Sequence, residues 1–142
     1  MLRAALAQLP GKLEAVAPIV ASRPLGPSSR QYANSTAVIA TKLDPDDLLA
    51  RLKQIERQFG RKPGGQRWTA RVLDLDIVLW SGGPWSSPSL TVPHPAFRER
   101  LFVLQPACTI APAWRDPITG LTLRQLAARL TRRLTKPGPL PR

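Results

Sequence analysis

Cysteine, acidic side chains and long apolar runs are all scarce in this chain of 142 residues. Its one cysteine, Cys108, excludes a disulfide within the chain and lies in an apolar run, which favours a small buried residue over a catalytic thiol. No stretch of about 18 apolar residues is present, so we expect no helix that spans a membrane. The N-terminal residues are too few and too interrupted for a signal peptide, and we expect a cytoplasmic protein.

The scarcity of acidic residues leaves the chain strongly basic, because 9 Asp and Glu stand against 21 Lys and Arg and the formal net charge is +12. Such an excess favours polyanionic partners, either nucleotides or nucleic acid. Hydrophobic residues make up 43% of the chain, which is typical of globular rather than disordered proteins. We therefore expect one domain over residues 1–142, with a basic, proline-rich tail from about residue 135.

Helices are predicted where apolar residues recur every three or four positions. The clearest covers residues 45–59, because Asp44 is a good N-cap and Pro45 suits the first helical position. Gly60 is expected to end this helix in the usual C′ role. The other predicted helices cover residues 2–9, 97–104 and 121–134.

Strands are predicted between these helices, in β-prone stretches bounded by glycine and proline. A strand is expected within residues 13–22, a second at 32–41 and a third at 72–80. Strands that alternate with helices in one short domain indicate an α+β sandwich. The predicted loops cover residues 23–31, 61–66 and 81–89.

Asp74 and Asp76 stand two positions apart in the third predicted strand. Side chains alternate between the faces of a strand, so both carboxylates are expected to point the same way. Two like charges on a buried strand are costly unless a cation lies between them. Arg67 and Arg71 lie just upstream. Carboxylates for a hard cation beside guanidiniums for phosphate indicate a site for a magnesium-bound polyphosphate.

Six short motifs follow one another between residues 22 and 120. In chain order they are Pro24-Leu25-Gly26-Pro27, Tyr32-x-Asn34, Ile55-Glu56-x-x-x-Gly60-Arg61, Arg67-Trp68-x-x-Arg71-x-x-Asp74-Leu75-Asp76-Ile77, Thr91-Val92-Pro93-His94 and Arg100-x-Phe102-Val103-Leu104. Any one of them alone is weak evidence. In this order and spacing they resemble the 6-hydroxymethyl-7,8-dihydropterin pyrophosphokinase family of folate synthesis.

The resemblance implies a ferredoxin-like αβ sandwich with an antiparallel sheet. It also implies transfer of the β,γ-diphosphate of ATP to the hydroxymethyl group of 6-hydroxymethyl-7,8-dihydropterin, with release of AMP. The expected partners are therefore these two small molecules, and neither a membrane nor nucleic acid. We expect a monomer or a weak dimer.

Residue roles follow from the matching positions. The resemblance places two Mg²⁺ ions on Asp74 and Asp76, where they bridge the ATP phosphates, with Arg67 and Arg71 beside the transferred group. Nucleotide-contacting positions match Glu56, Arg71, Ile77, Thr91, His94 and Arg100, and a mobile loop over the phosphates matches Arg61, Arg67 and Trp68.

The pterin pocket is implied by five further positions. Tyr32 and Phe102 resemble the two rings that sandwich the pterin. Asn34 would bond the edge of the pterin, because an amide offers both a donor and an acceptor. Ser22 and Leu25 match positions that line the pocket with backbone groups.

The chain departs from the family at its start. The family opens with a strand that ends in a Gly-Ser-Asn turn, whereas this chain starts inside the following helix, so we expect the first strand to be missing. A start codon assigned too late and a true N-terminal truncation both account for this. Smaller departures are Ala21-Ser22-Arg23-Pro24 before the first loop, Pro63 and Thr69-Ala70 in the mobile loop, and Pro95 after His94.

Two rival functions stay open at the level of sequence. One is a catalytically impaired remnant that binds nucleotide or pterin without turnover. The other is a basic nucleic-acid-binding domain, favoured by the charge of +12 but lacking the interleaved aromatic and basic residues of an RNA-binding sheet.

Overall fold

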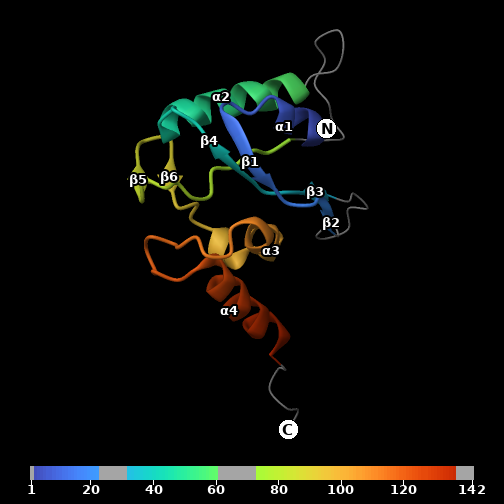
Figure 1. Ribbon diagram of the computed structural model, residues 1–142, viewed down its shortest axis with the longest axis vertical. Coiled ribbons are helices and arrows are strands. Elements are labelled where there is room, and N and C mark those ends of the chain that lie inside the picture. Colours follow the sequence, from blue (N-terminus) through green and yellow to red (C-terminus); the bar gives the residue numbers. More distant parts are fainter. Residues whose placement is uncertain (1, 23–31, 61–72, 137–142) are drawn as a thin grey trace.

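The computed structural model describes residues 2–22, 32–60 and 73–136, arranged as small antiparallel sheets between two groups of helices (Figure 1). The loops predicted at 23–31 and 61–66 and the tail at 137–142 lie outside the described residues. In chain order the elements are α1 (Leu2–Ala7), β1 (Lys12–Val16), β2 (Val20–Ser22), β3 (Tyr32–Asn34), β4 (Ala37–Ala40), α2 (Pro45–Phe59), β5 (Trp85–Ser86), β6 (Thr91–Val92), the 3-10 helix η1 (Phe97–Glu99), α3 (Leu101–Ile110) and α4 (Leu123–Thr135).

The first two predicted strands form the sides of one long antiparallel hairpin. β1 pairs with β4 from Lys12 opposite Ala40 to Val16 opposite Ala37, and β2 pairs with β3. Each side is interrupted once, where Ala17 donates its N–H to the carbonyl of Thr36 at 2.8 Å. The sheets are two-stranded and antiparallel, and together with the helices they confirm an α+β fold.

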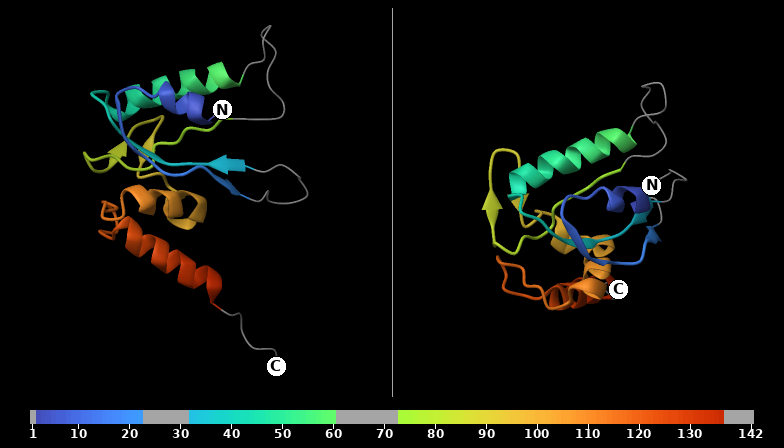
Figure 2. Two further views of the ribbon diagram at one scale, coloured as in Figure 1. Left: turned by 45° about the vertical axis from the view of Figure 1, so that its right-hand side comes forward. Right: turned by 45° about the horizontal axis from the view of Figure 1, so that its top comes forward.

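The helices lie on both sides of this hairpin (Figures 1 and 2). α1 and α2 cover one side, while η1, α3 and α4 lie on the other. Each side has its own core. The first core is built from Ala5, Leu52, Ile55, Leu73, Ile77 and Val92. The second core is built from Phe97, Leu104, Ala107, Leu123, Leu126 and Leu130.

Helix α2 has the bounds that its sequence predicts. The side chain of Asp44 accepts the N–H of Asp47 at 2.8 Å, and Pro45 occupies the first turn. The role predicted for Gly60 was wrong, because its φ is −87° rather than left-handed. Its N–H instead donates to the carbonyl of Glu56, so the helix closes with an ordinary helical hydrogen bond.

The strand predicted at 72–80 was also wrong for the described residues 73–80, which are extended but pair with no described strand. The alternation on which the prediction rested is present, because Leu73 and Ile77 are buried while Asp74 and Asp76 are exposed. A strand requires a neighbour with free ladder groups as well as a pattern. The loop predicted at 81–89 contains β5, which pairs with β6.

The C-terminal helices were predicted in outline. The segment 97–104 divides into η1 and α3 at Arg100, whose backbone is extended, and α3 continues to Ile110. α4 opens with a capping box in which Thr122 and Gln125 cap each other's backbone N–H groups. None of the helices in the described ranges is long and apolar enough to cross a bilayer.

Candidate functional site

Asp74 and Asp76 are two positions apart and lie on the solvent-exposed face of segment 73–80. Both are exposed, and the side chain of Asp76 keeps 53% of its accessible area. The prediction that these carboxylates share a buried strand, where a cation would be needed to offset the cost of burial, was therefore wrong. Their exposure instead leaves the carboxylate oxygens accessible to a ligand from solution.

Glu56 on α2 fixes the backbone between these two aspartates. Its Oε1 accepts the N–H of Leu75 at 2.7 Å, and its Oε2 accepts a hydrogen bond from Nζ of Lys53 at 3.1 Å. The N–H of Leu75 would otherwise be an unsatisfied donor beside a buried core, which is costly. The described contacts of Glu56 are thus to protein groups, and its predicted contact with a nucleotide stays a prediction.

His94 turns one ring nitrogen toward Asp76. Its Nδ1 accepts the N–H of Ala96 at 3.1 Å, so in the neutral ring the proton resides on Nε2. Nε2 lies 4.0 Å from Oδ2 of Asp76. The backbone N–H of His94 donates to the carbonyl of Val78 at 3.0 Å, which ties this residue to the segment that carries the carboxylates. The site therefore presents an N–H donor beside an acceptor-only carboxylate.

A cavity of about 290 Å³ is lined by Asp76 and His94 together with residues of α2. Four of the predicted nucleotide and metal positions line it: Asp76, Ile77, Thr91 and His94. The predictions missed other lining residues, chiefly Leu49 and Lys53 of α2. A signal for them was present, because positions 49, 53 and 56 recur at helical spacing and so share one face of α2. The loop before β6 completes the wall with Ser87, Pro88, Ser89 and Leu90.

The predicted pterin positions lie at the far end of the hairpin and at the start of α3. Ser22 and Tyr32 are opposite each other in the β2–β3 pairing, and Asn34 is opposite Val20. Phe102 is 46% exposed, and the guanidinium of Arg100 lies 5.7 Å from the centre of its ring. The structure thus pairs Ser22 with Tyr32 and Arg100 with Phe102. It does not include Arg100 in the lining of the 290 Å³ cavity.

Five of the predicted residues cannot be placed. They fall within residues 23–31 and 61–72, which lie outside the described residues, and their roles stay predictions. They are Leu25, Arg61, Arg67, Trp68 and Arg71.

The donor set at the cavity suits a cation that arrives with its own oxygen ligands. Within residues 2–22, 32–60 and 73–136, no group of three or more His, Cys, Asp and Glu is arranged to hold a metal. Magnesium binds through one or two carboxylates together with waters and substrate phosphates, rather than in an all-protein cage. The exposed carboxylates of Asp76, which lines the cavity, and of Asp74, which does not line it, fit that requirement.

Comparison with known proteins gives a family for most of the chain. Residues 1–112 match the model of the family described as 7,8-dihydro-6-hydroxymethylpterin-pyrophosphokinase (HPPK). Among individual proteins, the chain is 42% identical to the 2-amino-4-hydroxy-6-hydroxymethyldihydropteridine pyrophosphokinase of Pseudomonas aeruginosa over 118 residues, which are 82% of this chain and 72% of that protein.

Two other relatives with the same printed name are similar over shorter stretches. The Synechocystis protein is 40% identical over 105 residues, which cover 74% of this chain. The Bacillus subtilis protein is 37% identical over 100 residues, which cover 70% of this chain. The chain spans only 53% of the Synechocystis protein and 59% of the Bacillus protein.

Proposed function

The chain belongs to the 7,8-dihydro-6-hydroxymethylpterin-pyrophosphokinase family, and from this premise we propose that it transfers the β,γ-diphosphate of ATP to the hydroxymethyl group of 6-hydroxymethyl-7,8-dihydropterin, as a step of folate biosynthesis. AMP is the second product. The observation that carries the proposal is the 290 Å³ cavity, in which Asp76 of segment 73–80 converges with Thr91 and His94 of segment 91–95 on one face of α2.

Asp74 and Asp76 are the residues we assign to the cofactor. Their exposed oxygens would hold Mg²⁺, with two ions expected, in company with the phosphates of ATP. Magnesium bound there supplies charge neutralisation and polarises the transferred phosphoryl group. Glu56 contributes indirectly, because its bond to the N–H of Leu75 holds the backbone between the two carboxylates. The protein's part is therefore mainly to fix these oxygens in place.

His94 and the apolar wall of the cavity are assigned to ATP. The N–H at Nε2 of His94 is an available donor for a phosphate oxygen, and such charge-assisted bonds are about twice as strong as neutral ones. Leu49, Leu75 and Ile77 line the same cavity and give an apolar surface on which a base can pack. Phosphate at one end and base at the other is the orientation that these groups favour.

The pterin is assigned to the residues of the β2–β3 end and the start of α3. The exposed ring of Phe102 is available for stacking on a planar ring, which contributes about 0.5–1.5 kcal/mol beyond burial of area. Arg100 lies beside that ring and adjoins the segment that carries His94. Transfer requires the hydroxymethyl oxygen to reach the β-phosphorus in line, so the two ligands are expected to meet near Arg100.

We infer a ferredoxin-like αβ sandwich, supported by the way α1 and α2 cover one side of the β1–β4 pairing (Figure 1). Residues 73–77 alternate in burial as the residues of a strand do, which would suit this segment to pair with a neighbouring strand of that fold. Such a neighbour would satisfy the ladder groups for which the described residues supply no strand.

The direct test is release of AMP from ATP by the purified chain with Mg²⁺ and 6-hydroxymethyl-7,8-dihydropterin. The proposal requires AMP that depends on both the pterin and magnesium. A folded protein that binds MgATP and pterin but releases no AMP would instead support the impaired remnant. Binding to RNA that weakens steeply with salt, and that persists after replacement of both aspartates, would support the nucleic-acid-binding alternative.

A further inference from the structure

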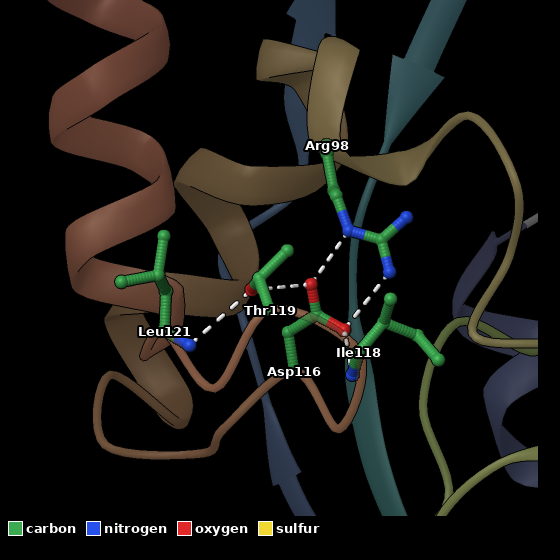
Figure 3. Close-up of polar contacts among 5 residues, drawn as sticks. All are labelled: Arg98, Asp116, Ile118, Thr119 and Leu121. Atoms are coloured by element: carbon green, nitrogen blue, oxygen red, sulfur yellow. Dashed lines mark hydrogen bonds and ion pairs between the residues drawn. The ribbon is translucent and has the colours of Figure 1, made fainter.

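A fully buried carboxylate lies away from the cavity, in the loop between α3 and α4 (Figure 3). Oδ2 of Asp116 accepts Nε–H of Arg98 at 2.6 Å and the hydroxyl of Thr119 at 2.7 Å. Oδ1 accepts a second guanidinium N–H of Arg98 at 2.9 Å and the backbone N–H of Ile118 at 3.0 Å. Arg98 therefore binds the carboxylate with both arms of its fork, while the loop supplies the remaining donors.

Asp116 is anchored firmly within its own loop. Its N–H donates to the carbonyl of Leu121, and its carbonyl accepts the N–H of Gly120, both at 2.8 Å. Burial alone would raise the pKa of Asp116, but the bonds from Arg98, Thr119 and Ile118 hold it at about 2, so the group is charged at neutral pH. The carboxylate is thus a rigid, charged point of attachment for Arg98.

Arg98 stands between two residues assigned to the reaction. It belongs to η1, where the N–H of Phe97 donates to the carbonyl of His94 and the N–H of Arg100 donates to the carbonyl of Phe97, both at 3.3 Å. His94, η1 and Arg100 therefore form one hydrogen-bonded turn. Fixing the side chain of Arg98 fixes this turn relative to the α3–α4 loop.

A second cavity, of about 390 Å³, lies between the Arg98–Asp116 pair and the segment 91–95. Its lining residues include Arg98 and Ile118 together with Val92 and Pro93. Thr91 and Pro95 line both this cavity and the 290 Å³ cavity, so the segment 91–95 separates the two. Val92 and Pro93 of this segment are buried, and Val92 belongs to the first core, so the segment is held by packing as well as by its hydrogen bonds and the turn that follows it.

We propose that Arg98 and Asp116 are positioning residues for the nucleotide, which act by holding the turn from His94 to Arg100 in place behind the 290 Å³ cavity. The proposal rests on the function proposed above. Neither residue touches the ligands. Their effect is expected on the affinity for MgATP, and much less on the affinity for pterin, which also depends on the β2–β3 end of the hairpin.

The test compares Asp116→Asn with Arg115→Ala in the full chain. Asp116→Asn keeps the size of the side chain but removes the charge that orients Arg98. Arg115→Ala is the matched control, because it removes a bond of 2.8 Å to the carbonyl of Gly120 in the same loop without touching η1. Calorimetry with MgATP and separately with the pterin, at a temperature where both variants retain the circular dichroism of the wild type, gives the affinities.

We expect Asp116→Asn to weaken MgATP binding about tenfold, with a change for the pterin of less than about twofold, and Arg115→Ala to change neither. Arg98→Lys, which keeps the charge but loses the fork, is expected to weaken MgATP about threefold and serves if Asp116→Asn does not fold. Unchanged MgATP affinity in a folded Asp116→Asn or Arg98→Lys would overturn the proposal, as would equal losses for both ligands.

The same experiments distinguish a failure of the proposed role of Arg98 and Asp116 from a failure of the proposed activity. A wild type that binds MgATP but releases no AMP contradicts the proposed activity, while the ratio of MgATP affinities still tests the pair. A wild type that binds no MgATP overturns both.

Discussion

The carboxylates beside the two cores of this protein differ in their exposure to solvent. Beside the second core, Asp116 is 0% exposed and accepts hydrogen bonds from Arg98, Thr119 and Ile118. Beside the first core, Asp74 and Asp76 are exposed. Near Asp76, the described part of the chain places Nε2 of His94 at 4.0 Å from Oδ2, which is too long for a hydrogen bond.

This difference separates charges that build the fold from charges that remain available to a ligand. A buried carboxylate must be matched by donors within the protein, because its desolvation otherwise costs several kcal/mol. An exposed carboxylate keeps its hydration and can exchange water for a cation at little cost to the fold. Replacing the first kind should therefore lower the stability of the fold, whereas replacing the second should lower activity with little change in stability.

The largest expected effect is on activity, from Asp76→Asn or Asp74→Asn. Each change removes a charged oxygen ligand for Mg²⁺, so turnover should fall by at least about a hundredfold. Because both side chains are exposed, the free energy of unfolding should change by no more than about 0.5 kcal/mol. AMP release over a magnesium titration and urea unfolding measure the two quantities. Activity near that of the wild type in either variant would refute the metal assignment.

The next effect is on stability, from Arg98→Met. It leaves the carboxylate of Asp116 buried without its cation, at a cost of about 3 kcal/mol or more. Urea unfolding at neutral pH measures the loss. The double variant Arg98→Met with Asp116→Leu is the control, because replacing both charges by apolar groups should recover part of the stability. A loss in the single variant no larger than that in Arg115→Ala would show that the pair contributes little to folding.

The pH dependence of stability gives a third, smaller effect. The folded-state pKa of Asp116 is about 2, below its ordinary value of 3.8, so the group stabilises the fold above pH 3.8 and loses this contribution as the pH falls toward 2. The difference corresponds to about 2 kcal/mol. Unfolding free energies measured between about pH 6 and pH 2 should fall less steeply in Asp116→Asn than in the wild type. Parallel curves would contradict the depressed pKa.

Local sequence signals were sufficient for the elements whose cause is local. The bounds of α2 follow from Asp44 and Pro45 at its start and from the apolar repeat that ends at Phe59. The common orientation of Asp74 and Asp76 follows from alternation, which needs no partner strand. The strand itself did not follow, because a ladder also requires a neighbour, and the sequence pattern contains no information about where that neighbour lies.

Contacts between distant residues had no comparable signal. Arg98 and Asp116 are 18 positions apart, and in the sequence each looks like an ordinary charged residue on the protein surface. The same holds for Glu56 and Leu75, whose 2.7 Å bond joins a helix to an extended segment 19 positions away. The cavity combines α2 with the loop before β6 for the same reason. Of these residues, the resemblance to a family had assigned a role only to Glu56, and it assigned Glu56 to a ligand rather than to the backbone.

The smallest expected effect concerns His94, which lies on the turn held by Arg98 and faces the exposed carboxylate of Asp76. His94→Ala removes the donor at Nε2 and should weaken MgATP binding about tenfold, since a hydrogen bond to a charged group makes a net contribution of about 1.5–3 kcal/mol. His94→Gln retains an N–H donor at a similar distance along the side chain and should recover part of the loss. Calorimetry with MgATP measures both. Equal affinities of the two variants for MgATP would mean that the N–H donor of His94 does not contribute to binding. The donor to the phosphates would then be another residue.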